Sequence, residues 1–79
     1  IEEKRSLLLT NKNLFNKTIK AVKDLIQDRN YYGVFLQKII RSGQKLPLSD
    51  DLKLRRGDEI RLIGKTEDLD KISIKIGTF

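Results

Sequence analysis

The sequence has 79 residues, with 17 Lys and Arg against 11 Asp and Glu, for a formal net charge of +6. This length predicts one domain, residues 1–79. A core this small is marginally stable, so a partner subunit is one way to bury more surface. The chain lacks Cys and His, which excludes disulfides, thiolate–metal sites and the commonest catalytic base. The excess of positive charge suits nucleic acid, anionic lipid or a phosphorylated ligand, although mixed charges are also ordinary on a solvated surface.

No apolar run approaches the ~20 residues that a membrane-spanning helix needs. The chain begins at Ile1 rather than Met and shows no signal-peptide pattern, so we expect a piece of a longer protein. The absence of Cys fits a cytosolic compartment.

The first predicted element is a strand, at about Lys4 to Asn11. Its centre is the apolar run Leu7-Leu8-Leu9, which has charged residues before it and the turn-forming "TNKN" after it. Short apolar runs with such boundaries are typical of buried strands.

An amphipathic helix is predicted next, over about Lys17 to Arg29. Asn16 or Thr18 can begin it by accepting a hydrogen bond from an unpaired backbone N–H, and Asn30 and Gly33 can end it. Its apolar residues recur at helical spacing: Ile19, Val22, Leu25 and Ile26.

Two strands of a hairpin follow, Val34 to Arg41 and Gln44 to Leu48. The first is rich in β-branched and aromatic residues, and Ser42-Gly43 between them is a hairpin signal. Pro47 has no N–H, so it belongs at a sheet edge or a strand end.

The stretch "LRRGDEIRLIG" contains the tripeptide Arg-Gly-Asp, which has two interpretations. As a cell-adhesion signal it needs an exposed loop tip of a secreted protein, and nothing in the sequence indicates secretion. As local structure, Gly57 supplies the backbone freedom of a tight turn and Asp58 accepts hydrogen bonds from nearby backbone N–H groups. We favour the turn, which leads into a strand at Glu59 to Ile63 with alternating apolar residues.

A final helix is predicted up to Ile76, with Gly77 as its stop. Thr66 is a good N-cap, and the acidic residues at 67 and 68 complement the helix dipole in the first turn. The residues Ile72–Ile76 also alternate as in a strand, so a terminal strand is the alternative. The predicted order is β-α-β-β-β-α, a small α+β sandwich with a mostly antiparallel sheet and helices on one face.

The sequence does not predict an enzyme or a metal site. Its acidic pairs, at 50/51 and 68/70, fall in a turn and a helix start, where backbone hydrogen bonds explain them. Its glycines are scattered singly, unlike a phosphate-binding loop, and no zinc-ligand spacing occurs.

A nucleic-acid-binding module is the alternative function. Tyr31 and Tyr32 beside Arg29 resemble the aromatic and basic groups on which such proteins stack bases. The competing interpretation is a helix end packed by tyrosine rings, which we favour because no further strand-borne aromatic set accompanies the pair.

Several motifs together resemble the TrkA C-terminal domain, also called the C-terminal domain of regulators of potassium conductance. They are Lys17-Thr18-Ile19 at a helix start, Gly33-Val34 opening a strand, Arg41-x-Gly43 in a hairpin, Pro47, and Leu54-x-x-Gly57-Asp58 before a strand that ends in Gly64. The segments "TNKNL" and "GVFLQKIIRSGQKLPL" are most similar to the copies of this domain within aspartate–alanine exchanger type transporters. Potassium uptake regulators and other cation transporters or antiporters are the next most similar group. The family often has Gly before "K-T"; Asn16 stands there and tolerates the same left-handed backbone.

The resemblance implies a cytosolic regulatory domain, usually dimeric, attached to the transmembrane part of a prokaryotic transporter. Some members bind a small ligand, including cyclic di-AMP, in a cleft at the dimer interface. By motif position, Arg41, Lys45, Leu46 and Pro47 border that cleft, and Arg and Lys are suited to phosphate oxygens. The competing interpretation of Arg41 is a solvated hairpin residue.

Overall fold

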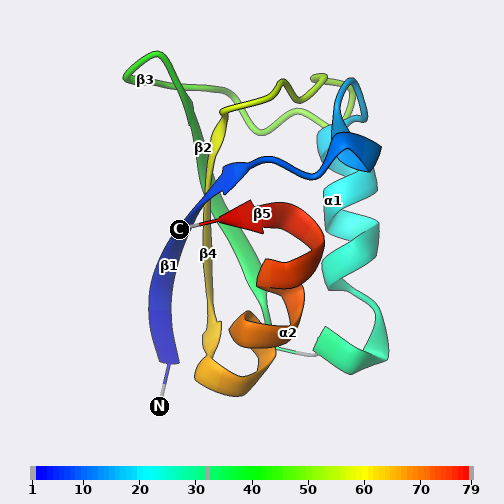
Figure 1. The fold of residues 1–79 in the computed structure, drawn as a ribbon, viewed down its shortest axis with the longest axis vertical. Coiled ribbons are helices and arrows are strands. Elements are labelled where there is room, and N and C mark those ends of the chain that lie inside the picture. Colours follow the sequence, from blue (N-terminus) through cyan, green and yellow to red (C-terminus); the bar gives the residue numbers. More distant parts are fainter. Residues whose placement is uncertain (1, 32, 79) are drawn as a thin grey trace.

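The computed structural model describes residues 2–31 and 33–78 and confirms an α+β fold with one sheet and both α-helices on the same face (Figure 1). Two short 3₁₀ helices, Lys12–Leu14 and Arg29–Tyr31, precede and follow the first α-helix. The strands and α-helices are β1 (Glu2–Leu9), α1 (Ile19–Ile26), β2 (Phe35–Arg41), β3 (Gln44–Lys45), β4 (Glu59–Lys65), α2 (Thr66–Ile76) and β5 (Gly77–Thr78).

The sheet has the strand order β3-β2-β4-β1-β5, and each neighbouring pair is antiparallel. The hairpin between β2 and β3 turns at Ser42 and Gly43, whose φ angles are +51° and +77°. Positive φ at both central residues is what a two-residue type I′ hairpin requires, and it matches the twist of the strands. A register shift between Leu36 and Lys38 interrupts the pairing of β2 with β4.

The core lies between the sheet and its two helices. Alternation within the strands places one apolar face of β1, β2 and β4 against the helices, as period-two patterns predict. The buried apolar residues are Leu7, Leu9, Ile19, Val22, Ile26, Tyr31, Val34, Ile39, Leu54, Ile60, Leu62, Leu69, Ile72 and Ile76. No helix in the described ranges is long and apolar enough to cross a membrane.

The first strand and the first helix differ from their predicted ranges. β1 ends at Leu9 rather than Asn11, because Asn11 caps the following 3₁₀ helix by accepting a hydrogen bond from Asn13 N at 3.0 Å. α1 begins after Thr18, whose Oγ1 accepts from Ala21 N at 3.3 Å. It ends at Ile26, before the predicted end at Arg29. Asn30, the predicted stop, lies instead within the 3₁₀ helix that follows.

The second strand of the hairpin is shorter than predicted. β3 ends at Lys45, and the residues up to Leu48 leave the sheet. Leu46 and Leu48 instead pack against the core from the side, and Pro47 between them is exposed and has no N–H to donate. By contrast, β4 runs beyond Ile63 to Lys65, because β1 pairs with it along its whole length.

The C-terminal segment is a helix, so the alternative of a strand over Ile72–Ile76 is wrong. Thr66 is its first residue rather than its cap; Lys65 occupies the cap position and makes no side-chain capping hydrogen bond. Gly77 ends the helix as predicted, but the sequence did not predict β5, which pairs with Leu8 and Leu9 of β1.

Candidate functional site

The four predicted ligand residues lie together at the β2–β3 hairpin. Arg41 ends β2, Lys45 ends β3, and Leu46 and Pro47 follow directly. Lys45 and Pro47 are exposed, whereas Leu46 is half-buried and donates its backbone N–H to Ile39 O at 2.8 Å. Arg41 pairs with Gln44 and Lys45 pairs with Ile40, so the two cationic side chains leave opposite faces of the hairpin.

Arg41 is held by a buried carboxylate. Its Nε donates to Asp58 Oδ1 and its Nη2 to Asp58 Oδ2, both at 2.8 Å, and Nη2 also donates to Lys53 O at 3.0 Å. Arg41 is therefore ion-paired as well as partly solvated, with 24% of its side chain exposed, and its role in ligand binding stays a prediction. Such a two-point contact fixes the plane of the guanidinium group and leaves Nη1 without a partner among the described residues.

Asp58 also organises the turn that precedes β4. Its Oδ2 accepts a hydrogen bond from Arg55 N at 2.8 Å, and its own N–H donates to Arg55 O at 3.1 Å. Gly57 within this turn has φ +84°, the left-handed region that favours glycine. The side chain of Asp58 is only 2% exposed, so it is not available for adhesion to another protein.

The charge state of this pair follows from its surroundings. Burial on its own raises the pKa of Asp58. The hydrogen bonds from the Arg41 side chain and from Arg55 N lower it, as do the positive charges of these two arginines, and the resulting pKa lies below the ordinary 3.8. The hydrogen bond to Asp58 raises the pKa of Arg41. Both groups are therefore charged at neutral pH.

An apolar groove of ≈ 740 Å³ opens beside the first half of β2. β3 pairs only with Ile40 and Arg41, so this half of β2 has no strand partner on its outer side in the part of the chain described. Phe35, at the start of the strand, is 61% exposed. The groove is lined by Lys23, Ile26, Gln27, Gly33, Val34, Phe35 and Leu36. Sequence reasoning missed Phe35, because an alternating pattern does not tell which face of a strand is covered.

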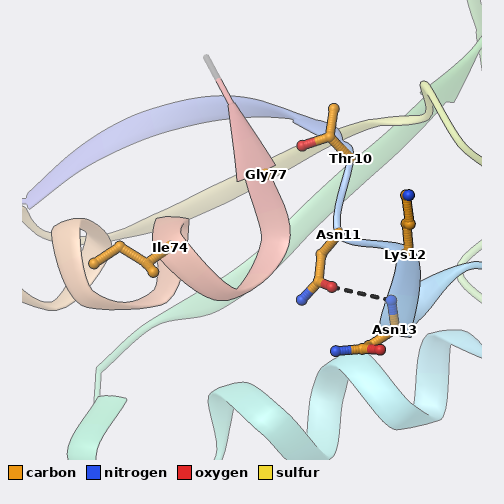
Figure 2. Close-up of a pocket in the computed structure, with 6 residues that line it drawn as sticks. All are labelled: Thr10, Asn11, Lys12, Asn13, Ile74 and Gly77. Carbon is orange, nitrogen blue, oxygen red and sulfur yellow. Dashed lines mark hydrogen bonds between the residues drawn. The ribbon is translucent and has the colours of Figure 1, made fainter.

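A second, more polar hollow of ≈ 590 Å³ lies between the chain after β1 and the end of α2 (Figure 2). Asn11 crosses it, since its Oδ1 accepts from Asn13 N while its Nδ2 donates to Lys75 O at 2.6 Å. Across residues 2–31 and 33–78, no group of three or more Asp and Glu side chains is placed to hold a metal ion.

Tyr31, one of the two tyrosines behind the nucleic-acid alternative, is not displayed as a stacking platform. Tyr31 is 8% exposed and belongs to the core, so its ring is not free to stack on a base. Tyr32 lies outside the described residues.

Comparison with known proteins identifies the family. The model of the TrkA-C domain matches residues 5–77. An uncharacterised transporter of Francisella tularensis subsp. tularensis is 92% identical over 79 residues, which is 100% of this chain and 14% of that protein. An uncharacterised transporter of Bradyrhizobium diazoefficiens is 34% identical over 71 residues, which is 90% of this chain and 12% of that protein.

A solved structure described as "Structure of RCK domain with cda" has the same fold, with a TM-score of 0.68 and 18% sequence identity. The alignment covers 92% of this chain and 96% of that one. The expected resemblance is thus confirmed by a family match over nearly the whole sequence, and this chain belongs to the TrkA-C domain family.

Proposed function

We propose that this chain is the ligand-sensing and dimerisation domain of a prokaryotic membrane transporter, on the cytoplasmic side. The observation that carries the proposal is the TrkA-C match over residues 5–77, together with relatives that are transporters several times longer. The transported solute is a cation such as potassium, or an amino acid as in exchangers of the aspartate–alanine type. A ligand that binds one dimer arrangement more tightly than another shifts the transporter's equilibrium by that difference in affinity.

The ligand is a small phosphorylated molecule such as cyclic di-AMP, held at the β2–β3 hairpin. Arg41 offers Nη1 from a guanidinium group whose orientation Asp58 already fixes, so little side-chain entropy is lost on binding. Lys45 adds an exposed ammonium group that forms no ion pair within the described ranges. Leu46 and Pro47 border the same site, and the similar RCK structure is described as containing "cda".

The dimer forms through the open edge of β2. In a monomer, Phe35 and the apolar groove beside it are exposed to water, which is unfavourable. A second copy of the chain would cover the ring and the groove together. Unpaired strand edges readily accept another strand, and the hairpin lies at the other end of the same strand. Ligand and dimer contacts would therefore share β2.

Ligand binding is tested by calorimetry and thermal unfolding with cyclic di-AMP. The wild-type chain is expected to bind and to unfold at a higher temperature. Lys45→Ala should weaken binding about tenfold, because it removes one charge-assisted hydrogen bond. Lys4→Ala removes another exposed lysine, on β1, and should bind like wild type. Absence of binding, or equal losses in the two variants, would count against the ligand site.

Dimerisation is tested separately by analytical ultracentrifugation. Phe35→Glu should shift the chain toward monomer, because it places a charge on the proposed interface. Ile74→Glu is the matched control, since Ile74 is also an exposed apolar residue but lies on α2. A wild-type chain that stays monomeric at high concentration, with and without ligand, would overturn the dimer.

A further inference from the structure

An isolated apolar side chain protrudes from the outer surface of α2. Ile74 is 84% exposed, the highest value among the large hydrophobic residues that the structure describes as exposed. It forms the common wall of two hollows, one of ≈ 590 Å³ toward the chain after β1 and one of ≈ 410 Å³ toward the 3₁₀ helix after α1. Figure 2 shows Ile74 on one rim of the first hollow and Asn11, Lys12 and Asn13 on the opposite rim.

Lysine residues line both hollows beside this isoleucine. Lys12 lines the first hollow, and Lys71 and Lys75 line the second. All three are exposed, and none forms an ion pair within residues 2–31 and 33–78. We call Ile74, Lys12, Lys71 and Lys75 the α2 patch.

The acidic residues of α2 lie toward its start, away from Ile74 and Lys75. Asp70, the acidic residue nearest along α2, is bound by Arg5 Nη1 at 2.7 Å. Glu67 and Asp68 lie about one helical turn before Lys71 and about two turns before Ile74. Asp28 accepts a hydrogen bond from Asn30 N at 2.9 Å, beside the 3₁₀ helix that lines the second hollow, and keeps its negative charge. The positive charge of the patch is therefore carried mainly by Lys12 and Lys75.

The chemistry that matches this arrangement is an anionic lipid surface. An apolar side chain can enter the boundary between headgroups and acyl chains, while long lysine side chains reach phosphate groups around it. Each lysine near an anionic bilayer contributes about 1 kcal/mol of attraction. An acidic peptide would instead use a longer apolar groove, such as the one beside β2, rather than a single protruding side chain.

We propose that the α2 patch docks this domain on the anionic membrane in which its transporter is embedded. This inference rests on the proposed function, because a domain tethered to a transporter stays close to the bilayer at high effective concentration. The patch lies on α2 and on the 3₁₀ helix before α1, and it shares no residue with the hairpin or with the groove beside β2. Membrane docking and ligand binding would therefore use different surfaces.

The test is co-sedimentation of the 79-residue chain with vesicles of phosphatidylcholine alone or mixed with phosphatidylglycerol. Wild type should bind only the vesicles that contain phosphatidylglycerol, and binding should fall as salt rises. The double variant Lys71→Gln/Lys75→Gln should partition about 30-fold less strongly, as two lost lysine contacts imply. Ile74→Ser should weaken partitioning about tenfold, and that loss should persist across salt concentrations.

The matched control is Lys4→Gln/Lys17→Gln, which lowers the net charge equally with exposed lysines outside the patch. It should bind almost as wild type. Equal losses in the two double variants would mean a response to net charge alone and would overturn the patch. Failure of wild type to bind at low salt would overturn the docking inference, while the ligand and dimer experiments would still judge the proposed function.

Discussion

The guanidinium group of Arg41 and the carboxylate of Asp58 meet at two points, with both nitrogen–oxygen distances at 2.8 Å. The contact joins the end of β2 to the turn before β4, residues 17 positions apart in sequence. Asp58 lies at 2% exposure and Arg41 at 24%, so water screens the pair weakly on the carboxylate side. This contact fixes Arg41, the proposed ligand residue, against the turn Arg56-Gly57-Asp58.

Asp58→Asn should destabilise the fold by about 3 kcal/mol, since it removes a buried charge and directs amide N–H groups at other donors. Urea unfolding followed by circular dichroism measures the change. Asp51→Asn is the control, because Asp51 is exposed and makes no side-chain hydrogen bond with the described residues. A loss as small as that of the control would mean that the Arg41–Asp58 contact adds little to stability.

The same pair predicts a dependence of stability on pH. Because the pKa of Asp58 is lower in the folded chain than its ordinary 3.8, its contribution is complete above pH 3.8 and is lost as pH falls below that value. The difference in unfolding free energy between wild type and Asp58→Asn should therefore shrink in this acidic range. A difference that stays constant down to the acid-unfolding limit would show that the carboxylate is not the titrating group.

Local patterns predicted most of the fold. The hairpin turn at Ser42-Gly43, the apolar face of β4 and the cap at Thr18 each depend on a few neighbouring residues, and each is present. Asn16 has φ +68°, the left-handed geometry expected where the family often has Gly. These features are set by backbone sterics and side-chain periodicity, which the sequence displays directly.

Long-range contacts could not be predicted in the same way. Nothing in the spacing of Arg41 and Asp58 indicates that they meet, because the meeting depends on how β2 packs beside β4. The short strand β5 depends on where α2 delivers Gly77 beside Leu9. The exposure of Phe35 and Ile74 depends on which surfaces the helices leave uncovered.

Replacing Gly57 should destabilise the fold through backbone strain alone. Its φ is +84°, and a Cβ there would meet nothing within 4 Å. Gly57→Ala should cost about 1 kcal/mol and Gly57→Val more, whereas Gly57→Asn should cost less, because Asn tolerates this region. The order Asn, Ala, Val in unfolding midpoints checks the turn. A valine variant as stable as the parent would mean that the turn assignment is wrong.

The two threonines at helix starts should differ in their effect on stability. Thr18→Ala should cost about 1 kcal/mol, because Thr18 Oγ1 accepts a hydrogen bond from Ala21 N at the start of α1. Thr66→Ala should cost clearly less, because Thr66 is the first residue of α2 rather than its cap and its hydroxyl donates to the partly exposed Glu3 carboxylate instead. Both substitutions remove the same atoms, so thermal unfolding of the pair isolates the capping hydrogen bond. Equal losses would contradict the finding that only the first threonine is a cap.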